Sequence, residues 1–358
     1  MDNRIESPQD DRLQELCGRL RDMAADLDRP GAWPAEQLRL CSEYGVFEWF
    51  LSPDVGGQGW SEADVMRGYL ELSSACLTTT FVITQRTGAC RRIEACDNEE
   101  LKARLLPDLV KGRTFATVGI SHLTTSRRHL AKPVLRAEET AEGFLLDGFS
   151  PWVTGGPFAD HILIGATLND GRQILAVMPM DAPGVSVAPV ADLVGLSASH
   201  TGPVQCDRVK LGREWLVAGP VEEVMKLGVG ARPGGFQTSA LAIGLAGGAV
   251  SFLHEEASKR EDLRKVTEAL HAEWHELRGD LLSAASDEPV CSTEKLRTRA
   301  NSLALRSSQA ALAAAKGTGY VVGHPAGRWC REALFFLVWS CPQPVMSANL
   351  CELAGLAD

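Results

Sequence analysis

The chain has 358 residues, of which 45% are hydrophobic and 23% charged, and its formal net charge is −10. This length and composition indicate a globular protein with two or three structural units and a large core. The negative charge argues against nucleic acid as a partner. We expect no membrane span, since no apolar run approaches roughly 18 residues. We also expect no signal peptide, since the first residues lack an apolar core, and therefore a cytoplasmic protein.

Residues 1–113 are predicted to form a helical domain. Apolar residues recur at helical spacing between residues 12 and 27, and further helices are predicted over 34–44, 61–76, 79–93 and 98–111. Ser61 precedes two acidic residues and is the expected N-cap of its helix. A turn rich in proline and glycine, at residues 53–59, separates the second helix from the third.

Residues 114–219 change character to short strand-like runs separated by turn residues. The runs cover 114–121, 133–138, 143–148, 161–168, 173–180, 185–190 and 202–211. Their spacing of roughly ten residues, with Asn169-Asp170-Gly171 as a hairpin signal, predicts an antiparallel sandwich or barrel. Because no helices alternate with these strands, a parallel nucleotide-binding sheet is not expected.

Residues 220–358 are again predicted to be helical, with helices over 239–260, 263–282, 293–316 and 326–356. The first is rich in alanine and glycine, which allows close helix packing. The third ends at Gly317-Thr318-Gly319, a C-cap signal, and the last is interrupted at residues 341–344. The chain is therefore predicted to be an α+β protein with domains over 1–113, 114–219 and 220–358.

Neither the scattered cysteines nor a histidine pair predicts a metal site. The ten cysteines occur singly, without a CxxC pair, and are predicted to be reduced thiols. His271 and His275 lie one helical turn apart, but no third ligand is apparent in the sequence. A solvated helix face is the preferred interpretation of this pair, and we expect no metal site.

Trp152 and Thr154 are the strongest candidates for contact with a ligand. They follow the predicted strand at 143–148 and precede the breaker Gly155-Gly156-Pro157. An indole at the end of a strand can lie on a planar cofactor while a neighbouring hydroxyl meets the edge of its ring. The alternative is an ordinary core tryptophan that caps the sheet.

The order of helices, strands and helices resembles the acyl-CoA dehydrogenase family over nearly the whole chain. The resemblance rests on residues 44–59 with their Gly56-Gly57-x-Gly59 turn, residues 99–112, residues 145–154 with Trp152-Val153-Thr154, and residues 317–333 with Gly317-Thr318-Gly319-Tyr320 and Arg331-Glu332-Ala333. It implies a helical N-terminal domain, a middle antiparallel β-domain and a C-terminal four-helix bundle.

The resemblance also implies cofactor and partners. FAD would bind with Trp152 beside the flavin ring and Thr154 at its N5 edge. Gly317 and Gly319 would approach the FAD of a neighbouring subunit, which implies a homodimer or homotetramer. Without the resemblance, the alternative interpretation of this glycine segment is a helix C-cap followed by a turn. The implied substrate is a small acyl compound such as a CoA thioester.

The loop expected to hold the flavin pyrophosphate departs from the family pattern. Residues 122–129 replace the family's T-E-P-x-A-G-S-D run with mostly different side chains. Hydroxyls followed by paired arginines can still bind an anion; a solvated basic loop is the alternative. The candidate cofactor contacts here are Ser121, His122, Thr124, Ser126, Arg127 and Arg128.

The catalytic position departs as well. Most family members place a glutamate there to remove the α-proton, and here Ser340 aligns with it. A serine hydroxyl is not a base at neutral pH unless another group activates it, and loss of a general base costs roughly 10²–10⁴-fold in rate. Residues 230–236, where other branches carry the glutamate, contain no acid. The candidate catalytic residues are Ser340, His122 and Cys341.

Three functions remain open at this point. The first is an FAD-dependent oxidoreductase acting on the Cα–Cβ bond of an acyl thioester or a related small substrate. The second is a flavin-dependent monooxygenase, which needs no α-proton base. The third is a flavin-free acyl-binding or assembly module. The retained Trp152 and Thr154 favour flavin, whereas the altered loop and the missing glutamate favour its loss.

Overall fold

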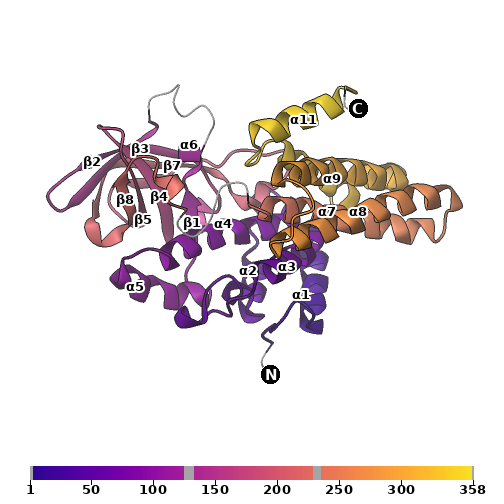
Figure 1. Ribbon diagram of the computed structural model, residues 1–358, viewed down its shortest axis with the longest axis horizontal. Helices are drawn as coiled ribbons and strands as arrows, with labels where there is room; N and C mark the ends of the chain where they lie inside the picture. The colour runs from indigo at the N-terminus through magenta and orange to yellow at the C-terminus, as the bar shows by residue number, and fades with distance from the viewer. Residues whose placement is uncertain (1–2, 125–132, 229–234, 357–358) are drawn as a thin grey trace.

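The computed structural model describes residues 3–124, 133–228 and 235–356. It consists of N-terminal helices, one sheet and C-terminal helices, in that order along the chain. Figure 1 shows the sheet at one end of the molecule next to α4 and α5, with α7, α8 and α9 at the other end. The predicted α+β class is confirmed.

Five α-helices form the N-terminal part: α1 (Asp11–Met23), α2 (Ala35–Glu43), α3 (Glu62–Ala75), α4 (Leu77–Glu94) and α5 (Glu99–Val110). Ser61 caps α3 as predicted, because its side chain accepts a hydrogen bond from the Asp64 N–H at 3.2 Å. The glycine turn at residues 53–59, which precedes α3, is required by close packing. A Cβ atom at Gly57 would lie 2.1 Å from the Leu51 carbonyl oxygen, so no side chain fits there.

The sheet contains β1 (Ala116–Gly119), β2 (Leu135–Glu139), β3 (Gly143–Val153), β4 (His161–Leu168), β5 (Gln173–Pro179), β6 (Val185–Val187), β7 (Gly202–Gly212) and β8 (Leu216–Val221), and a single helical turn, α6 (Ser121–Thr124), follows β1. The strand order is β6-β7-β3-β2-β4-β5-β8, with β1 beside β4. β3 is longer than predicted and carries two register shifts, so the strand itself reaches Trp152.

The antiparallel prediction is confirmed for most strand pairs but wrong for two. In the described residues, β1 and β2 both run parallel to β4. The spacing of turn signals identifies strands joined by short connections, which are antiparallel. Both parallel pairs join strands that are separated by other elements, so turn spacing carries no information about them.

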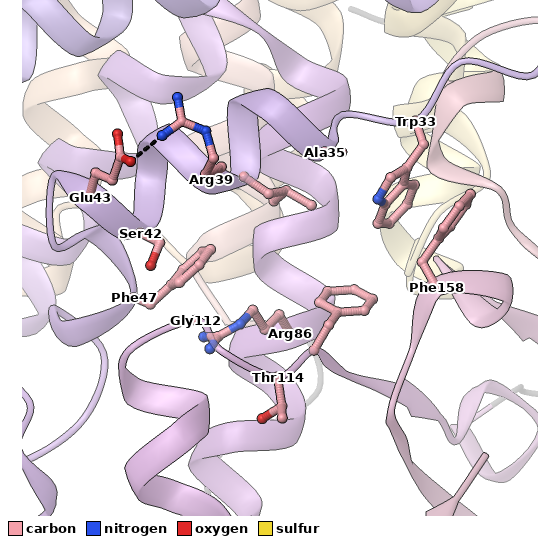
Figure 2. Close-up of a pocket in the computed structure, with 12 residues that line it drawn as sticks. Trp33, Ala35, Arg39, Ser42, Glu43, Phe47, Arg86, Gly112, Thr114 and Phe158 are labelled. Atoms are coloured by element: carbon pink, nitrogen blue, oxygen red, sulfur yellow. Dashed lines mark hydrogen bonds and ion pairs between the residues drawn. The ribbon is translucent and has the colours of Figure 1, made fainter. Parts of the chain in front are cut away.

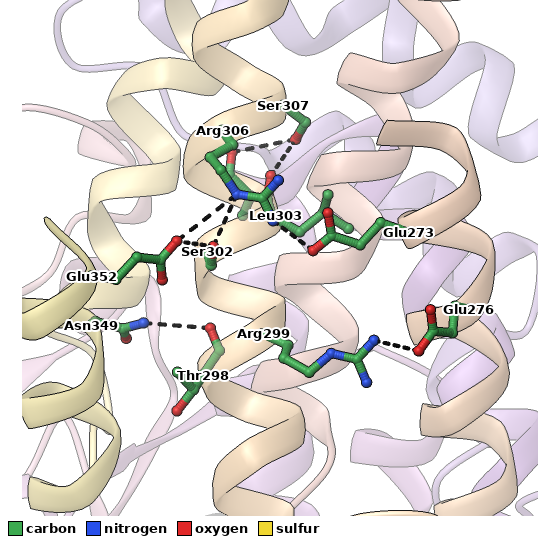
Figure 3. A network of polar contacts seen from close by, with 11 residues as sticks. Glu273, Glu276, Thr298, Arg299, Ser302, Leu303, Arg306, Ser307, Asn349 and Glu352 are labelled. Carbon is green, nitrogen blue, oxygen red and sulfur yellow. Dashed lines mark hydrogen bonds and ion pairs between the residues drawn. The ribbon is translucent and has the colours of Figure 1, made fainter. Parts of the chain in front are cut away.

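The C-terminal part contains α7 (Gln237–Ala257), α8 (Arg264–Ala285), α9 (Thr293–Ala315), α10 (Pro325–Ala333) and α11 (Gln343–Leu353). The interruption predicted at residues 341–344 separates α10 from α11. α9 ends as expected before Gly317, although the residue with positive φ is Lys316, and both glycines lie in a short 3₁₀ turn, Lys316–Tyr320. Ion pairs join α8, α9 and α11, as Figure 3 shows for Arg306, which binds Glu273 at 2.5 Å.

One hydrophobic core runs through the first and the last part of the chain. It includes buried residues of α1, α3, α7 and α9. The sheet has its own core, and a third cluster joins α4 and α5 to β1, β4 and β5. The three-domain division at 113 and 219 stays a prediction. No helix within the described ranges is both long enough and apolar enough to cross a bilayer.

Glu332 is a buried carboxyl group at the interface of α10 and α4. The Thr78 hydroxyl donates a hydrogen bond to it at 3.1 Å. Burial raises its pKa from an ordinary value of 4.5 to about 7, even though Arg328 and Thr78 favour the charged form. Between these two pH values the folded chain therefore holds a proton that the unfolded chain releases.

This proton linkage predicts that Glu332→Gln becomes relatively more stable than the wild type as pH rises from about 4.5 to about 7. Above this window the ionised carboxylate penalises only the wild type, and we expect a relative gain of about 1–3 kcal/mol. Denaturant unfolding at pH 5 and pH 8 measures it. Glu268→Gln, at an exposed position on α8, is the control. A difference between Glu332→Gln and wild type that does not change with pH would contradict the prediction.

Candidate functional site

Trp152 lies at the end of β3 with its indole directed toward solvent. It is 54% exposed, whereas Ser150 and Val153 on the same strand are buried. The alternative of a core tryptophan therefore does not describe this residue. A large exposed aromatic face on a rigid strand is suited to packing against a planar ligand.

Thr154 points the other way, into the protein. Its hydroxyl oxygen lies 2.9 Å from that of Thr201, which lies 2.9 Å from that of Ser199. All three side chains are buried. The backbone N–H of Gly155 also donates to the Ser199 carbonyl at 2.9 Å. This chain of hydroxyls fixes the end of β3 to the segment before β7, and contact of Thr154 with a cofactor stays a prediction.

The single turn α6 follows β1 and lies beside β3. His122 Nε2 lies 2.8 Å from the Gly165 carbonyl, so this nitrogen carries the proton and Nδ1 is left as an acceptor. Burial lowers the pKa of His122, although the bond to Gly165 opposes the shift, and the ring is neutral at pH 7. Thr124 donates to the Ser121 carbonyl at 2.9 Å. A neutral, anchored imidazole is a hydrogen-bonding group rather than a cation for phosphate.

Unpaired polar atoms gather around α6 and β3. The hydroxyls of Ser121 and Ser150 and the Nδ1 atom of His122 are buried without a hydrogen-bond partner among the described residues. Ser150 is next to Gly119, where a Cβ atom would lie 3.0 Å from its hydroxyl oxygen. Buried polar atoms normally have partners, so these exceptions indicate hydrogen-bonding capacity that a ligand or water can use. Ser126, Arg127 and Arg128 lie outside the described residues.

Ser340 lies between α10 and α11 and adopts a left-handed backbone conformation, with φ of 45°. It lines a cavity of about 250 Å³ together with Ser239 from α7 and Glu294 and Arg297 from α9. Glu294 is the carboxylate among the lining residues, and the sequence analysis missed it. Its position in the first turn of a predicted helix was evident, but nothing in the sequence related it to Ser340.

Arg297 gives the Ser340 cavity a buried positive charge. Its side chain is 5% exposed, its Nη2 donates to the Trp339 carbonyl at 3.1 Å, and its Nε has no partner in the described part of the chain. Burial lowers its pKa to about 10, which still leaves it cationic at pH 7. Burial also raises the pKa of Cys341, so the thiol is protonated at neutral pH. A protonated thiol is a poor nucleophile and no base.

The remaining candidates, Gly317 and Gly319, lie far from Ser340 within one subunit. Ser340 is at the N-terminal end of α9, whereas the two glycines follow its C-terminal end. A helix of 23 residues spans about 34 Å. The two sets of residues therefore cannot contact the same small ligand in one subunit.

Comparisons with known proteins agree with this architecture. The family model described as acyl-CoA dehydrogenase, N-terminal domain, matches residues 13–113. The short-chain-specific acyl-CoA dehydrogenase of Clostridium acetobutylicum is 24% identical over 187 residues, 51% of this chain and 49% of that protein. The structure of glutaryl-coenzyme A dehydrogenase with glutaryl-CoA superposes with a TM-score of 0.82 at 18% identity, covering 97% of this chain and 96% of that one. The chain is thus similar in sequence to acyl-CoA dehydrogenases over part of its length, and it has their fold over nearly all of it.

The same fold occurs in proteins of other activity. Dibenzothiophene monooxygenase from Paenibacillus sp. A11-2 superposes with a TM-score of 0.78 at 17% identity, covering 96% of this chain and 95% of that one. The chain also spans only about half the length of its Clostridium relative in their alignment. Similarity to acyl-CoA dehydrogenases therefore leaves the reaction of this chain open.

The hydroxyl chain at the end of β3 supports a stability prediction. Thr201→Val keeps the side-chain shape but leaves the buried hydroxyls of Thr154 and Ser199 without their shared partner. We expect a loss of about 1–3 kcal/mol in the free energy of unfolding, measured by denaturant titration. Thr318→Val is the control, because the Thr318 hydroxyl is exposed and water can replace its hydrogen bond to the Ala315 carbonyl. Equal stability of the two variants would show that the hydroxyl chain contributes nothing.

Proposed function

We propose that the protein is an FAD-dependent oxidoreductase that acts on the Cα–Cβ bond of an acyl thioester or a related small acyl compound. The observations that carry the proposal are the exposed indole of Trp152 on β3 and the buried, unpaired hydroxyls of Ser121 on α6 and Ser150 on β3. The names of the Clostridium relative and of the glutaryl-CoA dehydrogenase complex support a CoA thioester as substrate.

The described residues fit a flavin in part. Trp152 offers a face for the isoalloxazine ring, and Ser121 offers a free hydroxyl for a polar edge. Thr154 is less suited, because its hydroxyl is buried against Thr201. A bound flavin would supply a two-electron acceptor for the hydride at Cβ. The protein's own task is then to orient the acyl chain and to accept the α-proton.

The α-proton has no obvious acceptor at Ser340. Arg297, in the same cavity, is a cation and cannot take a proton. Glu294 lines the cavity and is ionisable, so we propose it as the substitute base, ahead of Cys341 and His122. Cys341 is held as a thiol by burial, and His122 does not line this cavity. Replacement of Glu294 by glutamine is then expected to abolish the residual reaction.

A flavin-dependent monooxygenase is the second candidate. The missing glutamate supports it, because oxygen chemistry on a reduced flavin needs no α-proton base, and dibenzothiophene monooxygenase has the same fold. Oxygen consumption with chemically reduced flavin and no acyl-CoA separates this activity from dehydrogenation. A protein that is colourless and does not retain added FAD would favour a binding or assembly module instead.

We also propose a homodimer or homotetramer located in the cytoplasm. Tyr320, Val321 and Val322 follow Gly319 and are all at least 63% exposed. Contiguous exposed apolar residues typically mark a contact surface. The distance between this end of α9 and Ser340 is consistent with the two ends serving different subunits' sites.

Trp152→Ala tests the flavin assignment. Removing the indole eliminates the stacking surface, so we expect lower flavin occupancy or a shifted visible spectrum after desalting in the presence of FAD. Stability should change little, because the side chain is largely exposed. Far-ultraviolet circular dichroism checks the fold, and Val187→Ala, at another exposed apolar residue of the sheet, is the control. An unchanged spectrum and occupancy would remove the main support for the proposal.

Ser340→Glu tests the reaction. A carboxylate beside Arg297 would stay ionised and would restore a base at this position, so flavin bleaching by a short-chain acyl-CoA should accelerate by about 10²–10⁴-fold. Stopped-flow absorbance measures the rate, and Ser340→Gln controls for side-chain size. If both the wild type and the glutamate variant retain flavin and neither is bleached by any acyl-CoA, dehydrogenation is the wrong reaction.

A further inference from the structure

A second cavity, of about 440 Å³, lies away from the candidate site and shares no lining residue with it. It is formed by α2, by α4, by residues 112–115 and by Phe158. Figure 2 shows Arg86 and Phe47 at one side and the rings of Trp33 and Phe158 at the other. The volume falls in the range of small-molecule sites. The proposed oxidoreductase function gives this cavity no role.

Arg86 places a buried positive charge in this cavity. The side chain is 2% exposed, its Nη2 donates to the Leu109 carbonyl, and its Cζ lies 3.9 Å from the centre of the Phe47 ring. Among the described residues, no carboxylate forms an ion pair with Arg86. The Leu109 carbonyl belongs to the last turn of α5 and supplies only a partial negative charge.

Arg86 is therefore a buried positive charge that has no carboxylate counter-ion among the described residues. Burying an ion is costly unless it is paired, and proteins normally pair buried arginines with carboxylates or phosphates. Burial lowers the pKa of Arg86, but a guanidinium remains protonated at neutral pH. An anion bound in the cavity would supply the missing partner through two parallel hydrogen bonds.

The rest of the lining selects the kind of anion. Trp33 stacks on Phe158 with ring centres 4.3 Å apart, and Phe115 meets Trp33 edge-on at 5.7 Å. The two other charged lining residues, Arg39 and Glu43, are paired with each other. The cavity therefore combines aromatic surface with a single uncompensated cation. An inorganic anion would leave the aromatic surface unused, whereas a flat organic acid uses both.

We propose that this cavity binds a small aromatic carboxylate, with its carboxylate on Arg86 and its ring against Trp33 and Phe115. The site is separate from the flavin proposal and does not require it. We infer this class of ligand because the guanidinium of Arg86 is planar, can donate two parallel hydrogen bonds and lines the same cavity as the aromatic rings. Aromatic rings pack edge-to-face or offset, as the lining rings already do with one another.

The experiment uses 4-fluorobenzoate as the probe and the full chain as purified, with fluorine NMR line broadening to measure affinity. We expect saturable binding that Arg86→Met weakens by about 10- to 100-fold, the value of a charge-assisted hydrogen-bond pair. Arg92→Met is the matched control, because Arg92 is also a buried arginine of α4 but does not line the cavity. Its affinity should match that of the wild type.

Two further arms keep the test decisive if Arg86→Met does not fold. On the wild-type protein, neutral 4-fluorobenzamide should bind at least about tenfold more weakly than the acid, and inorganic phosphate should not displace the probe at equal concentration. No binding of the acid, equal binding of the amide, or displacement by phosphate would each overturn the proposal. Repeating the titration with and without added FAD distinguishes this result from failure of the flavin assignment.

Discussion

The close approach of α7 to α3 is the contact on which the arrangement of the whole molecule depends. A Cβ atom at Gly244 would lie 2.6 Å from the Leu70 carbonyl oxygen, so only glycine allows the two backbones to meet. α7 is buried along most of its length and also packs against α8 and α9. Because of this central helix, residues more than 150 positions apart share one core.

This packing also determines how the Ser340 cavity is connected to the sheet that carries Trp152. Ser239, near the start of α7, lines the Ser340 cavity, and the aromatic contacts of Trp339 with Phe81 join that cavity to α4. α4 in turn supports β1 and the sheet that carries Trp152. Under the proposed function, the helical parts would supply the place for an acyl group, and the sheet would supply the surface for a planar ring. Neither part has both.

Sequence reasoning was most successful where local chemistry decides structure. The helix starts at Ser61 and Asn98, the interruption before α11 and the small-residue helix α7 all follow from capping, proline and size. It failed for the parallel strand pairs and for β8, and it did not report the contact of Thr154 with Thr201. These depend on which segments meet in space. The bond of Thr154 to Thr201 joins residues 47 positions apart, and no spacing rule reports it.

One residue, Gly155, relates the aromatic cavity to the candidate flavin surface. Gly155 directly follows Thr154, and a Cβ atom there would lie 2.7 Å from Trp33 and 2.8 Å from Phe115. The end of β3 is thus held on one side by the hydroxyls of Thr201 and Ser199 and on the other by the rings that line the aromatic cavity. Well-packed interiors transmit small displacements instead of absorbing them. Trp33 and Phe115 therefore line the aromatic cavity and at the same time pack against the backbone that follows Trp152 and Thr154, so the cavity and the candidate flavin surface share one boundary.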